Sequence, residues 1–320
     1  MKERNSGKLR RSSGKPNRPP NRPGGQLNGP GEHLHIQWFP GHMAKTRRMI
    51  RENLRLVDLV AELRDARVPY ASANPEIKKL LGSKKRIIIL NKSDMADPAA
   101  TKAWLEHFEK QQIAALAMDC RSGKGVGRFV PAVEKLLLEE LTRRRTKGMV
   151  GRPLRVMVVG VPNVGKSSFI NRMASSKRTK VEDRPGVTRG KQWVKLSDGM
   201  ELLDMPGVLW PKFEDPVVGE HLAFTGAVRD QIMDTEALAS RLLERLAVHY
   251  PALLVARYSL SSEEMAQQPG HVLLSLIGQK RGMLLPGGEI NTERASIAVL
   301  DEFRGGQIGK ITLELPKAEA

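Results

Sequence analysis

The sequence predicts an α/β fold, in which a mostly parallel sheet is covered by helices and is followed by a second, all-helical domain. Short apolar runs alternate with amphipathic stretches from residue 57 to about residue 203, a pattern typical of strands joined by helices. Beyond about residue 215 the strand signal fades, and residues 234–249 place leucines along one helical face. We therefore expect a sheet domain over residues 35–214 and a helical domain over residues 215–320.

Individual elements follow from the same patterns. The expected strands cover residues 57–63, 86–90, 113–118, 154–159, 192–196 and 201–203, and the expected helices cover residues 74–81, 98–110, 126–141, 234–249 and 291–303. Pro98 suits the first position of its helix, with Asp97 as the N-cap. Residues 142–153 hold several arginines and two glycines, which predicts an exposed basic linker.

The charge of the chain indicates a polyanionic partner. Its 53 Lys and Arg residues outnumber 35 Asp and Glu residues, and the formal charge is +18, although a merely soluble basic surface is the alternative. No apolar run approaches the roughly 18 residues of a membrane span, so nucleic acid is preferred to a membrane. The single cysteine, Cys120, cannot form an internal disulfide, which suits the reducing cytoplasm.

Residues 1–34 are expected to be a disordered basic tail. Repeated Pro, Gly, Lys and Arg with few apolar side chains cannot bury a core. The tail is either an arm that neutralises nucleic-acid phosphates or a solvated extension.

A phosphate-binding loop is predicted at Gly160–Ser167, which reads G-x-x-x-x-G-K-S. It follows the expected strand over residues 154–159 and precedes a helical stretch that starts at Lys166. Glycines let successive backbone N–H groups and a helix N-terminus face phosphates. Lys166 would bridge the terminal phosphates, and the Ser167 hydroxyl would bind Mg²⁺.

Two further segments are predicted to contact Mg²⁺ and the terminal phosphate of a bound nucleotide. Asp204-Met-Pro-Gly207 ends a predicted strand, where the carboxylate can reach Mg²⁺ through water and the Gly207 N–H can contact the phosphate. Thr188 lies between this segment and the phosphate loop, as expected of a switch threonine that joins Mg²⁺ only with triphosphate bound. A plain surface loop is the alternative for Thr188.

Asn91-Lys-Ser-Asp94 closes a predicted strand and suits the recognition of guanine. The Asp94 carboxylate can accept hydrogen bonds from the ring N–H and the exocyclic amine of guanine together, whereas adenine offers neither donor at those positions. We therefore expect GTP to be preferred to ATP. Asp119-Cys-Arg121 follows another strand, where a backbone amide would contact the guanine carbonyl.

The base-reading tetrapeptide precedes the phosphate loop, and in this order the motifs resemble those of circularly permuted GTPases, specifically the ribosome biogenesis GTPase A (YlqF/RbgA) family. Further matches are Trp38-Phe-Pro-Gly-His-Met43, Asp65-Ala-Arg-Val-Pro69, Arg281-Gly-Met and Gly287-Gly. The resemblance covers about residues 36–315. It implies a permuted Ras-like P-loop domain, a helical RNA-binding domain, and a factor for late maturation of the large (50S) ribosomal subunit through contact with ribosomal RNA. We expect the protein to be a monomer.

Two catalytic expectations follow from this resemblance. Ras-type enzymes place a water-orienting Gln after the D-x-x-G glycine, but this chain has Val208 and Leu209, so we expect slow turnover that the ribosomal subunit stimulates. By resemblance, His42 supplies the missing hydrogen bond to water, and Asn163 holds an activating K⁺ beside the phosphates. A structural or RNA-contacting histidine and a loop asparagine bonded to its own backbone are the alternatives.

These expectations define a candidate site. Its GTP-binding residues are Asn91, Lys92, Asp94, Asp119, Cys120, Asn163, Val164, Gly165, Lys166, Ser167, Ser168 and Gly207; its catalytic residues are His42, Lys166, Thr188 and Gly207; its metal ligands are Ser167, Thr188 and Asp204 for Mg²⁺ and Asn163 for K⁺. Two other functions remain open: an RNA-binding protein with a mainly structural nucleotide site, and a small-subunit assembly GTPase.

Overall fold

The computed structural model describes residues 41–149, 151–175, 192–196, 199–210, 213–228, 230 and 233–317, with side chains from residue 46 onward except that of Gln192. The predicted tail over residues 1–34 and the predicted switch residue Thr188 lie outside the described residues. The same holds for the side chain of His42, whose backbone is described.

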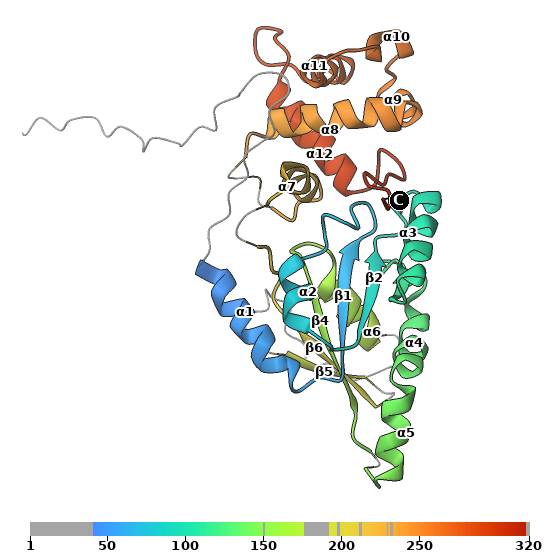
Figure 1. Ribbon diagram of the computed structural model, residues 1–320. Helices are drawn as coiled ribbons and strands as arrows, with labels where there is room; N and C mark the ends of the chain where they lie inside the picture. Colours follow the sequence, from blue (N-terminus) through green and yellow to red (C-terminus); the bar gives the residue numbers. More distant parts are fainter. Residues whose placement is uncertain are drawn as a thin grey trace, which may run out of the picture.

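A single six-stranded sheet forms the centre of the first part of the chain, with the strand order β3-β2-β1-β4-β6-β5 (Figure 1). All neighbouring pairs are parallel except β5 and β6, which are antiparallel. The strands are β1 (Leu59–Asp65), β2 (Arg86–Asn91), β3 (Ala114–Ala117), β4 (Leu154–Gly160), β5 (Gln192–Leu196) and β6 (Met200–Asp204). The predicted strands are thus confirmed in number and within two or three residues in position.

The largest shift concerns β1, which was expected over residues 57–63 and extends instead to Asp65. The last two residues of β1 are charged, so the apolar pattern in the sequence ends before the strand does. In the fold these charges are buried because they are paired: Arg64 contacts Glu62 at 2.8 Å and Arg67 contacts Asp65 at 2.9 Å. A buried ion pair inside a strand has no signature in the hydropathy of a single segment.

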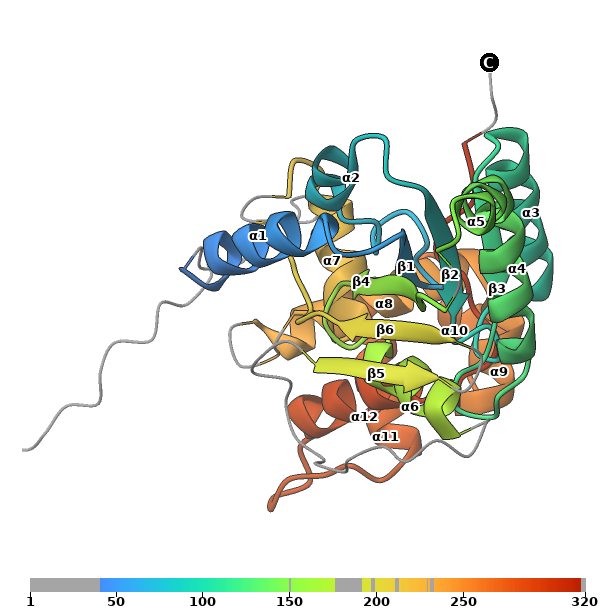
Figure 2. The same ribbon diagram turned by 90° about the horizontal axis from the view of Figure 1, so that it is seen from below.

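Helices cover both faces of the sheet, as Figure 2 shows. One face packs against α1 (Gly41–Leu54), α2 (Pro75–Leu81) and α3 (Pro98–Lys110). The other packs against α4 (Phe129–Leu136), which follows the short 3₁₀ helix η1 (Val126–Arg128), and against α6 (Lys166–Ser175). The N-caps of α2 and α3 are Asn74 and Asp97, each followed by a proline, so the predicted Asp97 cap is confirmed.

The prediction of an exposed basic linker over residues 142–153 is wrong for the first part of this segment. Helix α5 (Leu138–Thr146) continues into it, and Arg144 is buried against Asp58, with 2.5 Å between Nη2 and Oδ1. The single helix expected over residues 126–141 is divided into η1, α4 and α5. Pro131 explains the first division, because proline is tolerated only near the start of a helix.

The remaining helices form one region, which lies beyond the carboxyl ends of the parallel strands (Figure 1). These helices are α7 (Pro216–Phe224), α8 (Thr235–His249), α9 (Pro251–Tyr258), α10 (Ser262–Met265), α11 (Gly270–Lys280) and α12 (Thr292–Arg304). Helices α8, α11 and α12 pack on one another, and their apolar side chains join those of the sheet in one continuous core. Among the residues that the structure describes, no helix has the length and apolarity needed to cross a membrane.

Candidate nucleotide site

The predicted site residues whose side chains the structure describes lie in the segments that follow β2, β3, β4 and β6, including the first turn of α6. Parallel strands place their carboxyl ends at one edge of the sheet, which is where ligands bind in folds of this kind. The helical region faces this edge, so the site lies between the sheet and the helices (Figure 1).

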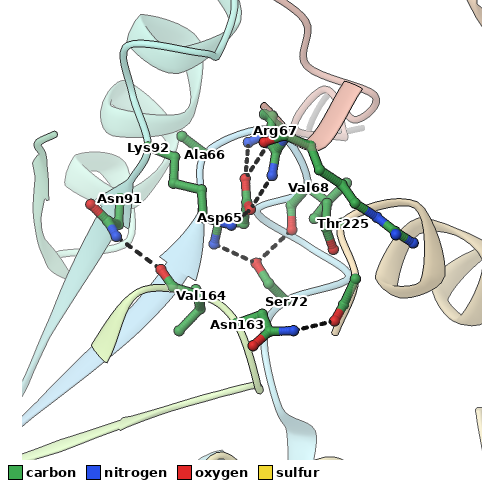
Figure 3. Close-up of polar contacts among 12 residues, drawn as sticks. Asp65, Ala66, Arg67, Val68, Ser72, Asn91, Lys92, Asn163, Val164 and Thr225 are labelled. Carbon is green, nitrogen blue, oxygen red and sulfur yellow. Dashed lines mark hydrogen bonds and ion pairs between the residues drawn. The ribbon is translucent and has the colours of Figure 1, made fainter. Parts of the chain in front are cut away.

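The phosphate loop is fitted closely to its neighbours. Gly165 has a φ of +97°, and a Cβ atom at this position would overlap the Asn91 amide nitrogen. That nitrogen donates a hydrogen bond to the Val164 carbonyl over 2.8 Å (Figure 3). At Gly160 a Cβ would lie 2.6 Å from the Leu63 carbonyl oxygen. The loop therefore requires glycine for space at both ends, and Asn91 connects it to the base-reading segment.

The Lys166 amine is held inside the phosphate loop by two backbone carbonyl groups. The side chain is buried, and the amine donates to the carbonyl oxygens of Val161 at 2.8 Å and Gly160 at 3.2 Å. Burial lowers the pKa of Lys166 to about 8, while the negative charge of Asp204 opposes this shift. Ser167 and Ser168 follow at the exposed start of α6, where backbone N–H groups are unpaired within the helix.

The Asp204–Gly207 segment lies against this loop. Asp204 ends β6 beside Val158 of β4, and a Cβ at Gly207 would come within 3.0 Å of the Lys166 amine. The next residue, Val208, donates its N–H to the Gly160 carbonyl at 3.2 Å. These contacts bring Asp204, Gly207 and Lys166 together at the phosphate loop.

Asn74 belongs to the same arrangement and was not predicted. Its amide nitrogen donates to the Val208 carbonyl at 2.9 Å, and its oxygen caps α2 by accepting from the Glu76 N–H at 2.9 Å. The sequence Asn-Pro at the start of a helix is a signal for the cap. It gives no indication of the second contact, which joins residues 134 positions apart.

The base-reading segment carries Asp94 on an exposed turn after β2, with Lys92 at a left-handed φ of 60°. The Lys92 amine lies 2.9 Å from Asp65 Oδ2, and the same carboxylate receives two hydrogen bonds from the Arg67 guanidinium (Figure 3). Burial raises the pKa of Asp65, but the positive charges of Arg67 and Lys92 outweigh it and hold that pKa well below its usual range. Asp65 and Arg67 belong to the Asp65-Ala-Arg-Val-Pro69 motif. The sequence did not predict the contact between Asp65 and Lys92.

The segment after β3 is adjacent, but its backbone is already engaged. The Cys120 N–H donates to Asn91 Oδ1 at 3.2 Å, and the Asp119 carboxylate accepts from the Arg121 N–H at 2.7 Å. Burial first, then the charges of Asp119 and Asp94, raise the pKa of the Cys120 thiol to about 12. A contact between one of these amides and guanine remains a prediction.

Asn163 faces the helical region rather than the interior of the loop. It has a left-handed φ of 57°, and its Nδ2 donates to the Gly226 carbonyl at 2.6 Å. A cavity of about 560 Å³ adjoins this contact, lined by Lys92 and Asn163 on one side and by Thr225, Gly226, Asp230 and Arg304 on the other. Predicted site residues therefore contact the helical region directly.

Comparisons with known proteins agree with this geometry. A family model described as "50S ribosome-binding GTPase" matches residues 155–252. The ribosome biogenesis GTPase A of Priestia megaterium is 47% identical, with 88% of this chain and 97% of that protein covered, and that of Thermotoga maritima is 32% identical, with 88% and 95% covered.

Solved structures agree as well. The "GDP-bound" YlqF structure has a TM-score of 0.62 at 29% identity and covers 84% of this chain and 99% of its own. The "GNP-bound" YlqF structure from T. maritima has a TM-score of 0.59 at 29% identity, with 85% and 99% covered. The fold is a circularly permuted P-loop GTPase domain with a helical region. The chain belongs to the ribosome biogenesis GTPase A family of ribosome assembly GTPases.

Proposed function

We propose that the protein hydrolyses GTP on the large ribosomal subunit, contacts its ribosomal RNA, and promotes late maturation of that subunit in the cytoplasm. The observation that carries the proposal is the site itself, in which Lys166, Asp204 and Gly207 converge at the phosphate loop. The family model's description supports the 50S subunit as partner, and the formal charge of +18 supports contact with RNA.

In this proposal the phosphate loop and the start of α6 hold the phosphates. Lys166 neutralises the terminal phosphates, while the exposed Ser167 hydroxyl and the Asp204 carboxylate supply hard oxygen ligands that suit Mg²⁺. Bound there, Mg²⁺ would offset the charge that develops on the phosphates. Thr188 completes the set when the triphosphate is present. The Gly207 N–H contacts the terminal phosphate.

Base recognition is assigned to Asp94, with Asn91 and Lys92 holding the surrounding loop. Asn91 contacts both the phosphate loop, through Val164, and the segment after β3, through Cys120. One side chain thus sets the distance between the phosphate-binding and base-reading parts. Such preorganisation is what a site needs to discriminate by hydrogen bonding.

Hydrolysis by the isolated protein is proposed to be slow. Val208 and Leu209 are buried apolar residues, so neither can orient water. We assign this role to His42, in the first turn of α1. The helix is held in place because Ile50 and Leu54 pack in the same cluster as Met205 and Val208. If His42→Ala turned over GTP as fast as the wild type on the subunit, this assignment would be wrong.

K⁺ activation is assigned to Asn163. The present contact uses Nδ2, and its amide oxygen has the chemistry of a K⁺ ligand. Asn163→Ala, which removes the side-chain oxygen, would then remove the difference between GTP turnover in K⁺ and in Na⁺. An unchanged K⁺ preference in Asn163→Ala would contradict the assignment.

The decisive experiment measures GTP turnover by the full chain, alone and with separated large or small subunits. Strong stimulation by large subunits only would support the proposal. Stimulation by small subunits would make the protein a small-subunit factor. No stimulation by either, despite tight GTP binding, would favour an RNA-binding protein with a structural nucleotide site.

A base-switch variant tests whether the assigned site carries the activity. In Asp94→Asn, the amide can donate to the second carbonyl of xanthine but no longer accepts from both guanine donors. We expect this variant to lose GTP turnover and to gain subunit-stimulated turnover of xanthosine triphosphate. Asp301→Asn, on the exposed side of α12, is the matched control and should keep its preference for GTP.

A further inference from the structure

The segment after α12 reaches back to the base-reading loop. We call residues 306–314 the strap and residues 91–97 the base-reading loop. In Figure 1 the strap lies between α12 and the start of α3, close to the carboxyl end of β2. Its residues have no assigned role in the proposed hydrolysis. Even so, they make hydrogen bonds to the backbone that flanks Asp94.

The first group of contacts is made with Met95, the residue that follows Asp94. The Ile311 N–H donates to the Met95 carbonyl at 2.9 Å. Gly306 lies so close to the Met95 side chain that a Cβ there would be 2.8 Å from its Cγ. The strap therefore holds Met95 through both its backbone and its side chain.

Thr312 makes the second group and joins two loops. Its hydroxyl accepts from the Asp97 N–H at 3.1 Å and lies 3.2 Å from the Ala66 carbonyl, to which it donates. The neighbouring Leu313 N–H donates to the Arg67 carbonyl at 2.8 Å. Thr312 is only 5% exposed, so these bonds are shielded from competing water.

The two loops that Thr312 joins meet again at the site. Ala66 lies between Asp65 and Arg67, and the Asp65 carboxylate pairs with Lys92 of the base-reading loop at 2.9 Å. Arg67 in turn donates to the Phe303 carbonyl at the end of α12. The helical region thus fixes the base-reading loop at Asp97 and Met95 directly, and at Lys92 through Asp65.

We propose that Thr312 is a positioning residue for guanine recognition, which acts through Asp97 and Ala66 to hold the base-reading loop in its binding conformation. This inference rests on the proposed role of Asp94 as the base-reading residue. Guanine is common to GDP and GTP, so the strap raises the affinity for both nucleotides by the same factor. Coupling is reciprocal, and either nucleotide therefore tightens the strap.

The hydroxyl is tested with two matched variants of the full chain, Thr312→Val and Thr312→Ser. Valine keeps the shape but leaves the Asp97 N–H without its acceptor, whereas serine keeps both hydrogen bonds. We expect Thr312→Val to weaken GDP binding by about tenfold, the scale set by a buried unsatisfied group. Thr312→Ser should bind GDP within about twofold of the wild type, since both of its bonds remain.

Inosine diphosphate separates positioning from general destabilisation. Its base lacks the exocyclic amine that Asp94 is proposed to contact, so a displaced Asp94 should lower the affinity ratio of GDP to inosine diphosphate. We expect that ratio to fall in Thr312→Val and to stay at the wild-type value in Thr312→Ser. Equal loss of both ligands, or unchanged GDP binding in Thr312→Val, would overturn the inference.

Hydrogen exchange in the wild-type chain tests the reciprocal effect without any substitution. The Ile311 and Leu313 amides should gain protection equally with GDP and with a GTP analogue. Protection by the analogue alone, or by neither nucleotide, would overturn the inference. If the wild-type chain bound no GDP, the proposed function itself would fail, and this outcome is distinguishable from a strap that does not respond.

Discussion

The Asn74 side chain connects the start of α2 to Val208, the residue that follows Gly207. Its Nδ2 donates to the Val208 carbonyl at 2.9 Å while its Oδ1 caps the helix at the Glu76 N–H. Because the Val208 N–H is also bonded to the Gly160 carbonyl, Val208 is held through both its backbone N–H and its backbone carbonyl. Asn74 therefore helps to fix the position of Gly207, whose N–H is proposed to contact the terminal phosphate.

Replacing Asn74 with Asp should reduce the preference for triphosphate over diphosphate. Aspartate still caps α2, but its carboxylate oxygen would face the Val208 carbonyl in place of a donor. We expect the affinity ratio of a GTP analogue to GDP to fall by about tenfold. Asp234→Asn exchanges the same two residues at the N-cap of α8 and should leave the ratio unchanged. An equal ratio in Asn74→Asp and wild type would contradict the prediction.

Lys166 should change its protonation behaviour when a nucleotide binds. Burial lowers its pKa to about 8, and phosphate oxygens beside the amine favour the charged form, so the pKa should rise in the complex. In ¹³C-labelled protein, one lysine side-chain resonance should titrate near pH 8 without nucleotide and stay protonated to at least about pH 10 with GDP. Lys166→Met identifies the resonance by removing it. A pKa near 10 in the free protein would refute the prediction.

Motifs in contiguous sequence predicted the strands of the sheet and indicated which residues would lie together at its edge. The apolar runs located all six strands, and the glycine and aspartate motifs located Lys166, Asp204 and Asn91 at one edge. These residues were predictable because parallel strands bring their carboxyl ends together whatever the order of the strands in the chain. Permutation of the motifs therefore did not affect the prediction.

Contacts between distant polar residues were not predictable. Asn74 with Val208, Asp65 with Lys92, and Thr312 with Asp97 each depend on how separate elements pack. The residues that surround a single polar residue in the sequence do not indicate whether its side chain faces water or bonds to a distant partner. Arg144 shows the opposite error, because its basic surroundings suggested exposure although it is buried against Asp58.

Asp65 should contribute stability that depends on pH. Arg67 and Lys92 hold its pKa well below the unfolded value of about 3.9, so the stabilisation is present above that value and is lost as the pH falls below it. Removing one partner from a buried pair typically costs about 3–5 kcal/mol. Urea unfolding of Asp65→Asn at pH 7 should show a loss of this size, with a smaller difference from wild type at about pH 2.

A surface carboxylate provides the comparison for Asp65. Asp301 lies 3.9 Å from Arg304, and its side chain is 69% exposed. Asp301→Asn should change the free energy of unfolding by less than about 1 kcal/mol at pH 7, because exposed pairs contribute little. Equal losses in the two variants, or an Asp65→Asn loss that does not change with pH, would show that the Asp65 charge is not the source of the stability.

Gly165→Ala should disrupt the contact that joins the phosphate loop to the base-reading segment. The new Cβ would overlap the Asn91 amide nitrogen, so the hydrogen bond from Asn91 to the Val164 carbonyl would be lost. The φ of +97° at residue 165 would also strain the alanine backbone. We expect GDP affinity to fall by roughly 5- to 150-fold in calorimetry, which corresponds to the cost of about 1–3 kcal/mol for such strain. Gly127→Ala is the control, because outside its own turn of η1 no atom lies within 4 Å of its Cβ position.

A double-variant cycle identifies the cause of the Gly165→Ala effect. Asn91→Ala removes the overlapping amide and by itself costs the hydrogen bond to Val164. If overlap is the cause, Gly165→Ala should destabilise the Asn91→Ala chain much less than it destabilises the wild type, since the atom it strikes is gone. Equal destabilisation in both backgrounds, measured by urea unfolding without nucleotide, would instead assign the loss to the left-handed backbone of residue 165 alone.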